Sequence, residues 1–358
     1  MNKVELENDA LARRGIAVIK DGQSPAGAYI ASPNFSQYGF CWLRDGSYCA
    51  LAMQAVGQWA SAWRFHAWVA SAVGARLAGV DAPGQARLPA RYRLDGTPEP
   101  AQSGWANFQL DGYGTWLFTL YDAVRLGPSS SEIDAVLPVA VDVADYIAAS
   151  WRLPCFDYWE ETADRLHTST LAALAAGLRA AARLTGQPGY DATAGEIVAF
   201  MRERCVAGGG FVKAVGDARV DGALLSLGVP FGLVGLDDPL FQTTLGRIRA
   251  ELSSPSGGGR RYVGDSYYGG GPWVLLTAWL GWCDRLIGDD PGCARARDWV
   301  RAHAGPDGTL PEQVIDEPQA PDMVGVWLDR WGPVADPLLW SHAKYLLLLA
   351  GREVPPWS

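Results

Sequence analysis

The sequence predicts an all-α fold, an (α/α)6 barrel in which six helical hairpins close into a ring as a single domain, residues 1–358. Helical periodicity runs through the chain, and no sustained alternation of apolar and polar residues competes with it. The links between helices alternate between tight turns and long loops rich in Gly, Pro and aromatic residues. Long loops are usually functional, and six closing hairpins would bring all of them to one end of the ring.

The predicted helices follow in order from an N-terminal segment of good helix formers. The Ala-rich segment 170–184 is stopped by Gly186-Gln187-Pro188, and 222–228 is short and the weakest of the set. The full set covers residues 6–14, 45–56, 59–73, 110–125, 131–150, 170–184, 190–204, 222–228, 238–252, 273–287, 292–304 and 338–350. The long loops cover residues 22–43, 74–109, 151–168, 253–272 and 305–337. The expected inner helices, each entered directly from a candidate site loop or segment, lie near 45–56, 110–125, 170–184, 219–228, 273–287 and 338–350.

Bulk composition limits the function classes. Length alone suggests about two domains, but 49% hydrophobic residues suffice for one large core. The net charge of -9 and the absence of a basic run argue against nucleic acid and anionic membranes as partners. Apolar stretches are too short to span a bilayer, and residues 1–7 lack the apolar run of a secretory signal, so a cytoplasmic protein is expected.

The six Cys residues contain no Cys-x-x-Cys pair and have no His neighbour at ligand spacing. We therefore expect no metal site and no cofactor, and we interpret the cysteines as reduced core residues. Only four His residues are present, at positions 66, 167, 303 and 342, so catalysis by a His-based triad is poorly supported.

The first candidate site motif is Tyr38-Gly-Phe-Cys-Trp42-Leu-Arg44-Asp45-Gly46, at a loop-to-helix junction. Asp45 in this position could be a simple helix cap. Alternatively the motif is a sugar clamp. Arg44 would then donate to vicinal hydroxyls, Asp45 would accept from them, and the two aromatic rings would cover sugar C–H groups. The related motif Gln109-Leu-Asp111-Gly, with Trp105 upstream, also precedes a helix and has the same two interpretations.

The third motif, Asp157-Tyr158-Trp159-Glu160-Glu161, places adjacent carboxylates beside a tryptophan. A neighbouring negative charge and an apolar wall both raise the pKa of a carboxyl, and a carboxyl that stays protonated near neutral pH can serve as a general acid. The alternative is a solvated acidic turn, which is the usual meaning of a bare Glu-Glu pair.

Two more loops carry candidate residues. The Gly-rich stretch 259–273, with Arg261, Asp265 and Tyr267, lacks the Gly-Lys-Ser/Thr of a phosphate loop, and it is interpreted as a loop that closes on a polar, uncharged ligand. Pro311-Glu312-Gln313 and Pro337-Leu-Leu-Trp340-Ser-His342 complete the set. Taken singly, a residue such as Glu312 is more often a solvated side chain than a catalytic one, and a residue such as His342 is more often structural than catalytic.

In this order, the motifs resemble those of the glucoamylases and related enzymes of glycoside hydrolase family 15, from about residue 30 to residue 350. The resemblance implies an (α/α)6 barrel and hydrolysis with inversion. It assigns Glu160 as general acid and Glu312 as general base. The substrate-binding residues that it and the motifs suggest are Tyr38, Trp42, Arg44, Asp45, Trp105, Gln109, Asp111, Trp159, Glu161, Arg261, Asp265, Tyr267 and Trp340.

The chain departs from the family pattern in two ways. Asn107 stands where fungal members often have Arg, and no accessory β-sandwich or starch-binding module is visible. An aromatic crater without an accessory module favours a small oligosaccharide substrate, a short α-glucoside attacked from its non-reducing end. The resemblance to small, stand-alone bacterial members of the family implies isomaltose or another α-1,6 oligosaccharide as the substrate, with β-glucose as product. Cleavage of α-1,4 maltooligosaccharides or of trehalose is the alternative. A sugar epimerase or a non-catalytic sugar-binding barrel is more distant, and the sequence leaves the oligomeric state open.

Overall fold

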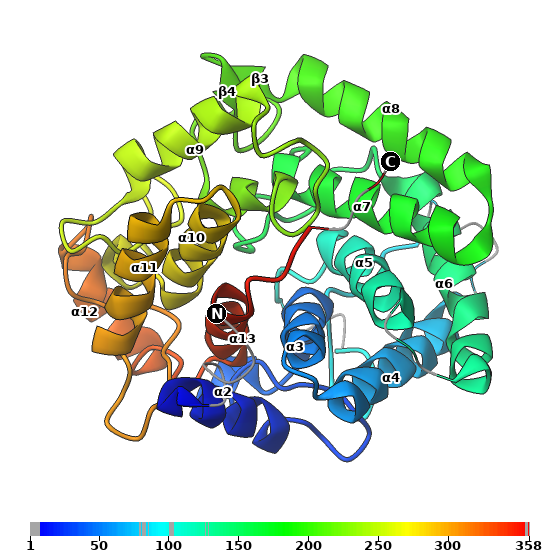
Figure 1. Ribbon diagram of the computed structural model, residues 1–358, viewed down its shortest axis with the longest axis horizontal. Coiled ribbons are helices and arrows are strands. Elements are labelled where there is room, and N and C mark those ends of the chain that lie inside the picture. The colour runs from blue at the N-terminus through cyan, green and yellow to red at the C-terminus, as the bar shows by residue number, and fades with distance from the viewer. Residues whose placement is uncertain are drawn as a thin grey trace.

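The computed structural model describes residues 8–78, 80, 84, 86–99, 104–125, 127, 129–354 and 357. These residues form a ring of paired helices (Figure 1), so the predicted (α/α)6 barrel is confirmed. The inner ring consists, in order, of α3 (Leu43–Ala55), α5 (Asp111–Arg125), α7 (Thr168–Thr185), the 3-10 helix η4 (Gly222–Leu227), α10 (Val274–Leu286) and α13 (Leu339–Ala350). Each inner element contacts the next, and α13 closes the ring against α3.

Outer helices cover the inner ring. They are α2 (Ala10–Asp21), α4 (Trp59–Leu77), α6 (Ser130–Ser150), α8 (Pro188–Arg204), α9 (Pro239–Leu252) and α11 (Asp290–Ala302). The strand pairs of the described residues are both short and antiparallel: β1 (Cys41–Trp42) with β2 (Arg91–Tyr92), which α3 and α4 separate in the chain, and β3 (Val206–Ala207) with β4 (Gly210–Phe211), which form a hairpin. The 3-10 turns η1 (Ser36–Tyr38) and η5 (Tyr267–Gly270) lie in the site loops.

Inner helices are buried on nearly every side, which explains why they are rich in small and apolar residues. Gly114 of α5 and Gly177 of α7 let two backbones approach each other. A Cβ atom on Gly114 would lie 2.2 Å from the carbonyl oxygen of Ala173, and one on Gly177 would lie 2.6 Å from Cα of Gly114. The α7 helix ends at Gly186 with a φ of 70°, as its stop signal predicted.

The structure corrects three helix predictions. Residues 6 and 7 lie outside the described residues, and α2 is capped by Asp9 and continues past residue 14 to Asp21. Segment 222–228 forms a 3-10 helix rather than an α-helix, because Pro230 follows within a turn and cannot continue a helix. The predicted loop 305–337 contains a further helix, α12 (Asp322–Trp331), which has no fully buried residue and packs on the core only through half-buried side chains such as Trp327 and Trp331.

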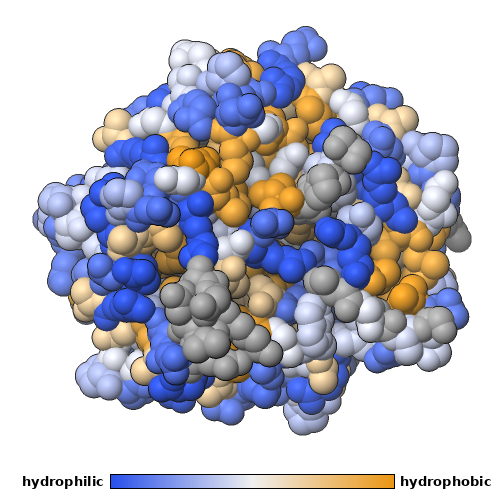
Figure 2. All heavy atoms as spheres, viewed as in Figure 1, coloured by the Kyte–Doolittle hydropathy of each residue, from blue (hydrophilic) through white to orange (hydrophobic). Residues whose placement is uncertain are grey.

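The surface seen in Figure 2 carries polar and charged residues over much of the face shown in Figure 1, with smaller apolar groups between them. Within the described residues, no helix has the length and apolar character needed to cross a bilayer.

Candidate active site

A pocket of about 470 Å³ is lined by residues from all five predicted long loops and from the first turns of two inner helices, α3 and α13. The lining comprises Ala31, Gln37, Tyr38, Trp42, Arg44, Asp45, Gly104, Trp105, Ala106, Tyr158, Trp159, Glu160, Glu161, Arg261, Tyr267, Trp273, Glu312, Trp327, Arg330, Trp331, Leu338 and Trp340. The long loops therefore meet around one pocket, as the barrel topology predicted. Its volume falls within the range of about 300–1,000 Å³ that is usual for small-molecule sites.

The pocket brings together all of the predicted site residues except three. Gln109, Asp111 and Asp265 are fully buried behind it. Gln109 Oε1 and Asp111 Oδ2 accept hydrogen bonds from Nη1 of Arg44, at 2.8 and 3.1 Å. The structure places these three side chains, which were predicted to bind substrate, in contact with Arg44 and Arg261, the arginines that line the pocket.

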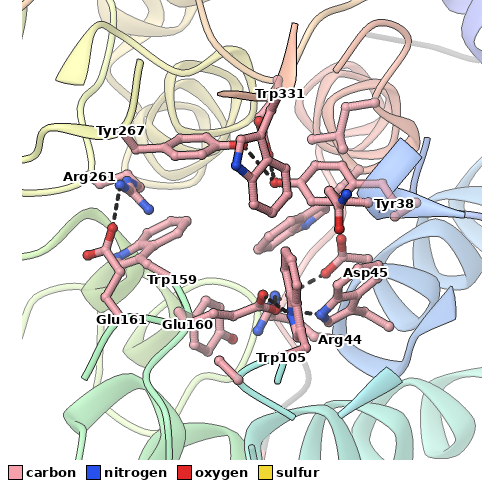
Figure 3. Close-up of a pocket in the computed structure, with 18 of the residues that line it drawn as sticks. Tyr38, Arg44, Asp45, Trp105, Trp159, Glu160, Glu161, Arg261, Tyr267 and Trp331 are labelled. Carbon is pink, nitrogen blue, oxygen red and sulfur yellow. Dashed lines mark hydrogen bonds and ion pairs between the residues drawn. The ribbon is translucent and has the colours of Figure 1, made fainter. Parts of the chain in front are cut away.

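Glu160 is held by two indole groups (Figure 3). Its Oε2 accepts a hydrogen bond of 2.7 Å from Nε1 of Trp105, and its Oε1 accepts from Nε1 of Trp42. Nη2 of Arg44 lies 3.8 Å from Oε1. Burial raises the pKa of Glu160 above its usual value, and the positive charge of Arg44 offsets only part of this effect. A raised pKa favours the protonated form that a general acid requires.

The backbone at Glu160 is unusual, because its φ is 65°, in a region that residues other than glycine rarely adopt. Asp157 stabilises this turn. Its carbonyl accepts from the Glu160 N–H at 3.0 Å, and its Oδ1 accepts from the Glu161 N–H at 2.8 Å. Strained backbone of this kind persists where the surroundings fix it and is common at functional sites.

Glu312 approaches the pocket from the segment before α12. Its Oε1 accepts a hydrogen bond of 3.0 Å from the hydroxyl of Tyr38, which lies 3.1 Å from the hydroxyl of Tyr267. Within the described residues, Oε2 of Glu312 has no hydrogen-bond partner. Burial raises the pKa of Glu312 to about 8, although the hydrogen bond from Tyr38 and the charge of Arg261 act against it.

The floor of the pocket is an arginine between aromatic rings. The Arg44 guanidinium lies 4.9 Å from the ring centre of Tyr158 and 5.1 Å from that of Trp340. Its Nε donates to Oδ1 of Asp45 at 3.2 Å, and Asp45 also lines the pocket. Flat apolar faces beside paired donors and acceptors suit a sugar ring, which has hydroxyls at its edge and C–H groups on its faces.

A second arginine stands on another wall. Nη2 of Arg261 lies 2.8 Å from Oε1 of Glu161 (Figure 3). Its Nε lies 2.7 Å from Oδ2 of Asp265. The guanidinium also lies 5.4 Å from the ring centre of Trp159. Glu161 is 36% exposed at its side chain, so its carboxylate is accessible from the pocket as well as paired.

Several lining residues were missed from the sequence. Trp327, Arg330 and Trp331 come from α12, which was predicted as loop. Tyr158 and Trp273 lie within the predicted site motifs and Gln37 directly precedes the first of them, but none of the three was assigned to the site. Arg330 and Trp331 follow Trp327 by three and four residues, and this spacing is the signal that could have identified a helical face.

The histidines do not belong to the site, since none is among the lining residues described. Nε2 of His342 accepts from the backbone N–H of Leu310 at 3.0 Å, and Nε2 of His167 lies 2.8 Å from the carbonyl oxygen of Thr162. These are structural contacts, as expected for His342. In the part of the chain that the structure describes, no cluster of three or more His, Cys, Asp or Glu is arranged to hold a metal ion.

Comparison with known proteins gives consistent results. A model of the family described as glycosyl hydrolases family 15 matches residues 5–282, a span that includes Glu160 but not Glu312. Among curated proteins, the chain is similar to an isomaltose glucohydrolase of Kribbella flavida, with 41% identity over 94% of this chain and 91% of that protein. It is 25% identical to Trehalase 1 of Sulfolobus acidocaldarius, over 76% of this chain and 53% of that protein.

Solved structures agree with this fold. A wild-type glycosidase superposes with a TM-score of 0.88 at 39% identity and covers 98% of both chains, and a variant glycosidase in complex with glucose gives the same values. A bacterial glucoamylase complexed with acarbose has a TM-score of 0.77 at 22% identity, over 98% of this chain and 56% of that one, and shares the fold.

Proposed function

Because the chain belongs to the glycosyl hydrolases of family 15, a family of glycoside hydrolases, we propose that it releases β-glucose from the non-reducing end of isomaltose or another short α-1,6-linked glucoside. The observation that carries this proposal is the 41% identity, over 94% of the chain, to a protein named isomaltose glucohydrolase. The pocket supports it, because a crater lined by tryptophans admits a chain end rather than the middle of a polymer.

In the proposed reaction Glu160 is the general acid. It transfers its proton to the glycosidic oxygen as the bond between that oxygen and the anomeric carbon breaks. The indole N–H groups of Trp42 and Trp105 fix the direction of its carboxyl group. The raised pKa of Glu160, caused by burial, keeps the proton available.

Glu312 is the proposed general base. It removes a proton from a water molecule whose oxygen bonds to the anomeric carbon on the face opposite the leaving group, which inverts the configuration. Oε1 is fixed by Tyr38, and Oε2 has no partner among the described residues, so it is available to accept the proton of the water. The two carboxyl groups line the same pocket, as a two-carboxylate mechanism requires.

The remaining polar groups fit the two sugars of a disaccharide. Arg44 and Asp45, with the Trp340 ring behind them, are proposed to bind the terminal glucose at the floor. Glu161 and Arg261 are proposed to contact the second sugar on the leaving-group side. All of these groups make charge-assisted or hydrogen-bonding contacts in the structure that fix their orientation before a substrate arrives.

The test compares kcat/KM for isomaltose, isomaltotriose, maltose, trehalose and soluble starch, because this ratio measures discrimination between substrates. Isomaltose is expected to rank first. A preference for maltose or trehalose would contradict the linkage only, whereas a preference for starch would contradict the proposal of a short substrate. Proton NMR of early products should show β-glucose first, and early α-glucose would contradict the role proposed for Glu312.

The alternative of α-1,4 or trehalose hydrolysis has one supporting observation, the similarity to Trehalase 1 at 25% identity. The same panel of substrates distinguishes it. Family membership argues against the epimerase and the non-catalytic barrel, and the pocket lining contains no histidine among the described residues that could move a proton in an epimerase.

A further inference from the structure

Helix α12 lies beside the pocket without belonging to the barrel wall. None of its residues is buried, and its main contact is with η5, where the Ala320 N–H just before the helix donates to the Gly269 carbonyl at 2.9 Å. Three of its side chains nevertheless line the pocket, those of Trp327, Arg330 and Trp331. The helix therefore contributes little to the core and much to the site.

The two tryptophans of α12 join rings from opposite parts of the rim. Ring centres are 4.9 Å apart for Tyr267 and Trp327, 6.3 Å for Trp327 and Trp331, and 5.6 Å for Trp331 and Trp105. Figure 3 shows Trp331 between Tyr267 and Trp105. We call this series of four rings the aromatic arc. The Arg330 guanidinium lies 5.1 and 5.4 Å from the ring centres of its two helix neighbours and packs against both.

Both ends of the arc touch the proposed catalytic groups. Trp105 donates to Glu160, and Tyr267 lies at hydrogen-bond distance from Tyr38, which donates to Glu312. The arc therefore spans the region next to the bond that would be cleaved, rather than a distant surface.

The arc lies at the mouth and not at the floor. Trp340 is 4% exposed at the floor, while Trp327 and Trp331 are half-buried. A glucan that enters by its end places its terminal glucose on the floor. Its remaining sugars must then pass the arc, so the position of these rings decides how many sugars can follow the first.

We propose that α12 determines chain-length specificity, with Trp331 as the residue that closes the leaving-group side beyond the second sugar. A disaccharide fits between the floor and the arc, whereas the third sugar of a longer chain meets the Trp331 ring. This inference rests on the proposed function, since it assumes exo-hydrolysis of a short α-glucoside. It assigns the limit on substrate length to one helix that carries none of the proposed acid–base groups.

The experiment replaces Trp331 with Ala and measures kcat/KM for the disaccharide and the trisaccharide in both the α-1,6 and the α-1,4 series. The ratio of trisaccharide to disaccharide is the readout. Any disturbance of Glu160 transmitted through Trp105 affects both substrates equally and leaves the ratio unchanged. We expect the ratio to rise by about tenfold or more, the usual effect of relieving a steric limit in an apolar pocket.

Two controls accompany this variant. Leu328→Ala changes a residue of the same helix that is 36% exposed and does not line the pocket, so it should keep the parent ratio. Trp331→Phe keeps an aromatic ring and should give a ratio between those of the parent and Trp331→Ala. Because α12 has no buried residue, neither truncation should impair folding of the barrel.

Each result has one meaning. An unchanged or lower ratio in Trp331→Ala, with disaccharide still hydrolysed, contradicts the role of α12 and leaves the proposed function intact. If the parent protein prefers maltose, the proposed α-1,6 linkage is wrong, and the ratio of trisaccharide to disaccharide is then taken from the α-1,4 series. A parent protein that hydrolyses neither disaccharide contradicts the proposed function and this inference with it.

Discussion

Replacing Lys213 with Met is expected to weaken both the fold and the candidate acid, although Lys213 does not line the pocket. Its Nζ lies 2.6 Å from Oδ2 of Asp221 and 3.0 Å from Oδ2 of Asp157, and all three side chains are at most 5% exposed. Burial alone would lower the pKa of Lys213, but the charges of the two aspartates raise it overall, so the amine is held as a cation.

The expected loss in the free energy of unfolding depends on which hydrogen bonds the two aspartates keep when Lys213 is replaced. Removing one partner of a buried ion pair costs about 3–5 kcal/mol. Asp221 would keep its hydrogen bonds from Nε1 of Trp159 at 3.0 Å and from the Ala223 N–H at 2.8 Å, and Asp157 would keep the Glu161 N–H. The lower limit of about 3 kcal/mol is therefore expected, which an m-value of about 3 kcal/mol/M converts to a fall of about 1 M in the urea midpoint.

Activity should also fall, because Asp157 stabilises the positive φ of Glu160. We expect kcat to decrease by about 10- to 100-fold, the effect of a small misplacement of a reacting group. Arg202→Met is the matched control. The Arg202–Asp238 pair has the same distance of 2.6 Å, but Arg202 is 42% exposed, so its loss should cost less than about 1 kcal/mol.

A pH series separates the electrostatic explanation from lost packing. Burial would raise the pKa of Asp157, but Lys213 and the Glu161 N–H lower it below its ordinary value. Its contribution to stability is therefore present above about pH 4 and lost as the pH falls through the folded pKa. Without Lys213 burial dominates, so the deficit of the variant should be larger at neutral pH than near pH 4. A deficit that is independent of pH, or a midpoint equal to that of Arg202→Met, would refute this reasoning.

Three further predictions concern the pocket. Glu160→Gln and Glu312→Ala should each lower kcat by about 10²–10⁴-fold with an unchanged melting temperature; activity within threefold or so of the parent would show a misassigned carboxylate. Catalysis needs Glu312 ionised and Glu160 protonated, so kcat/KM should follow a bell-shaped pH profile, and both limbs should lie above the ordinary glutamate pKa because burial raises the pKa of both carboxyls; a maximum near the ordinary glutamate pKa would contradict this. Asp265→Asn should raise KM for isomaltose about tenfold by releasing the Arg261 guanidinium, with kcat less affected; an unchanged KM would show that Arg261 needs no such partner.

The predictable part of the site consists of residues at junctions between long loops and inner helices. Arg44 and Asp45 open α3, and Trp340 lies at the second position of α13, so the barrel topology alone brings them to one end. The sequence could not tell which residues of a junction face the pocket. Asp111 opens α5 but points to Arg44 from behind, because consecutive positions of a helix point in different directions.

Two elements, α12 and η4, could not be predicted correctly from the sequence. Helix α12 does carry a periodic stripe of half-buried apolar residues, Val324, Trp327 and Trp331, but it is only ten residues long and lies between Pro321 and Gly332, so the stretch was predicted as loop. The 3-10 helix η4 (Gly222–Leu227) takes a place in the inner ring although it is short, because its neighbours bury all of its residues. Tertiary packing determines both features, and local propensity carries little information about either.

The N-terminal segment 38–44 connects the two candidate carboxyls, which lie far apart in the chain. Tyr38 donates to Glu312 and Trp42 donates to Glu160, and the rings of this pair are 5.5 Å apart. Arg91 of the paired strand β2 lies 4.9 Å from the Trp42 ring centre, which supports the ring from behind. One short segment therefore contacts both the proposed acid and the proposed base. Glu312 lies beyond residue 282, where the family match ends. The hydrogen bond from Tyr38 therefore links this last part of the chain to the part of the pocket that the N-terminal residues form.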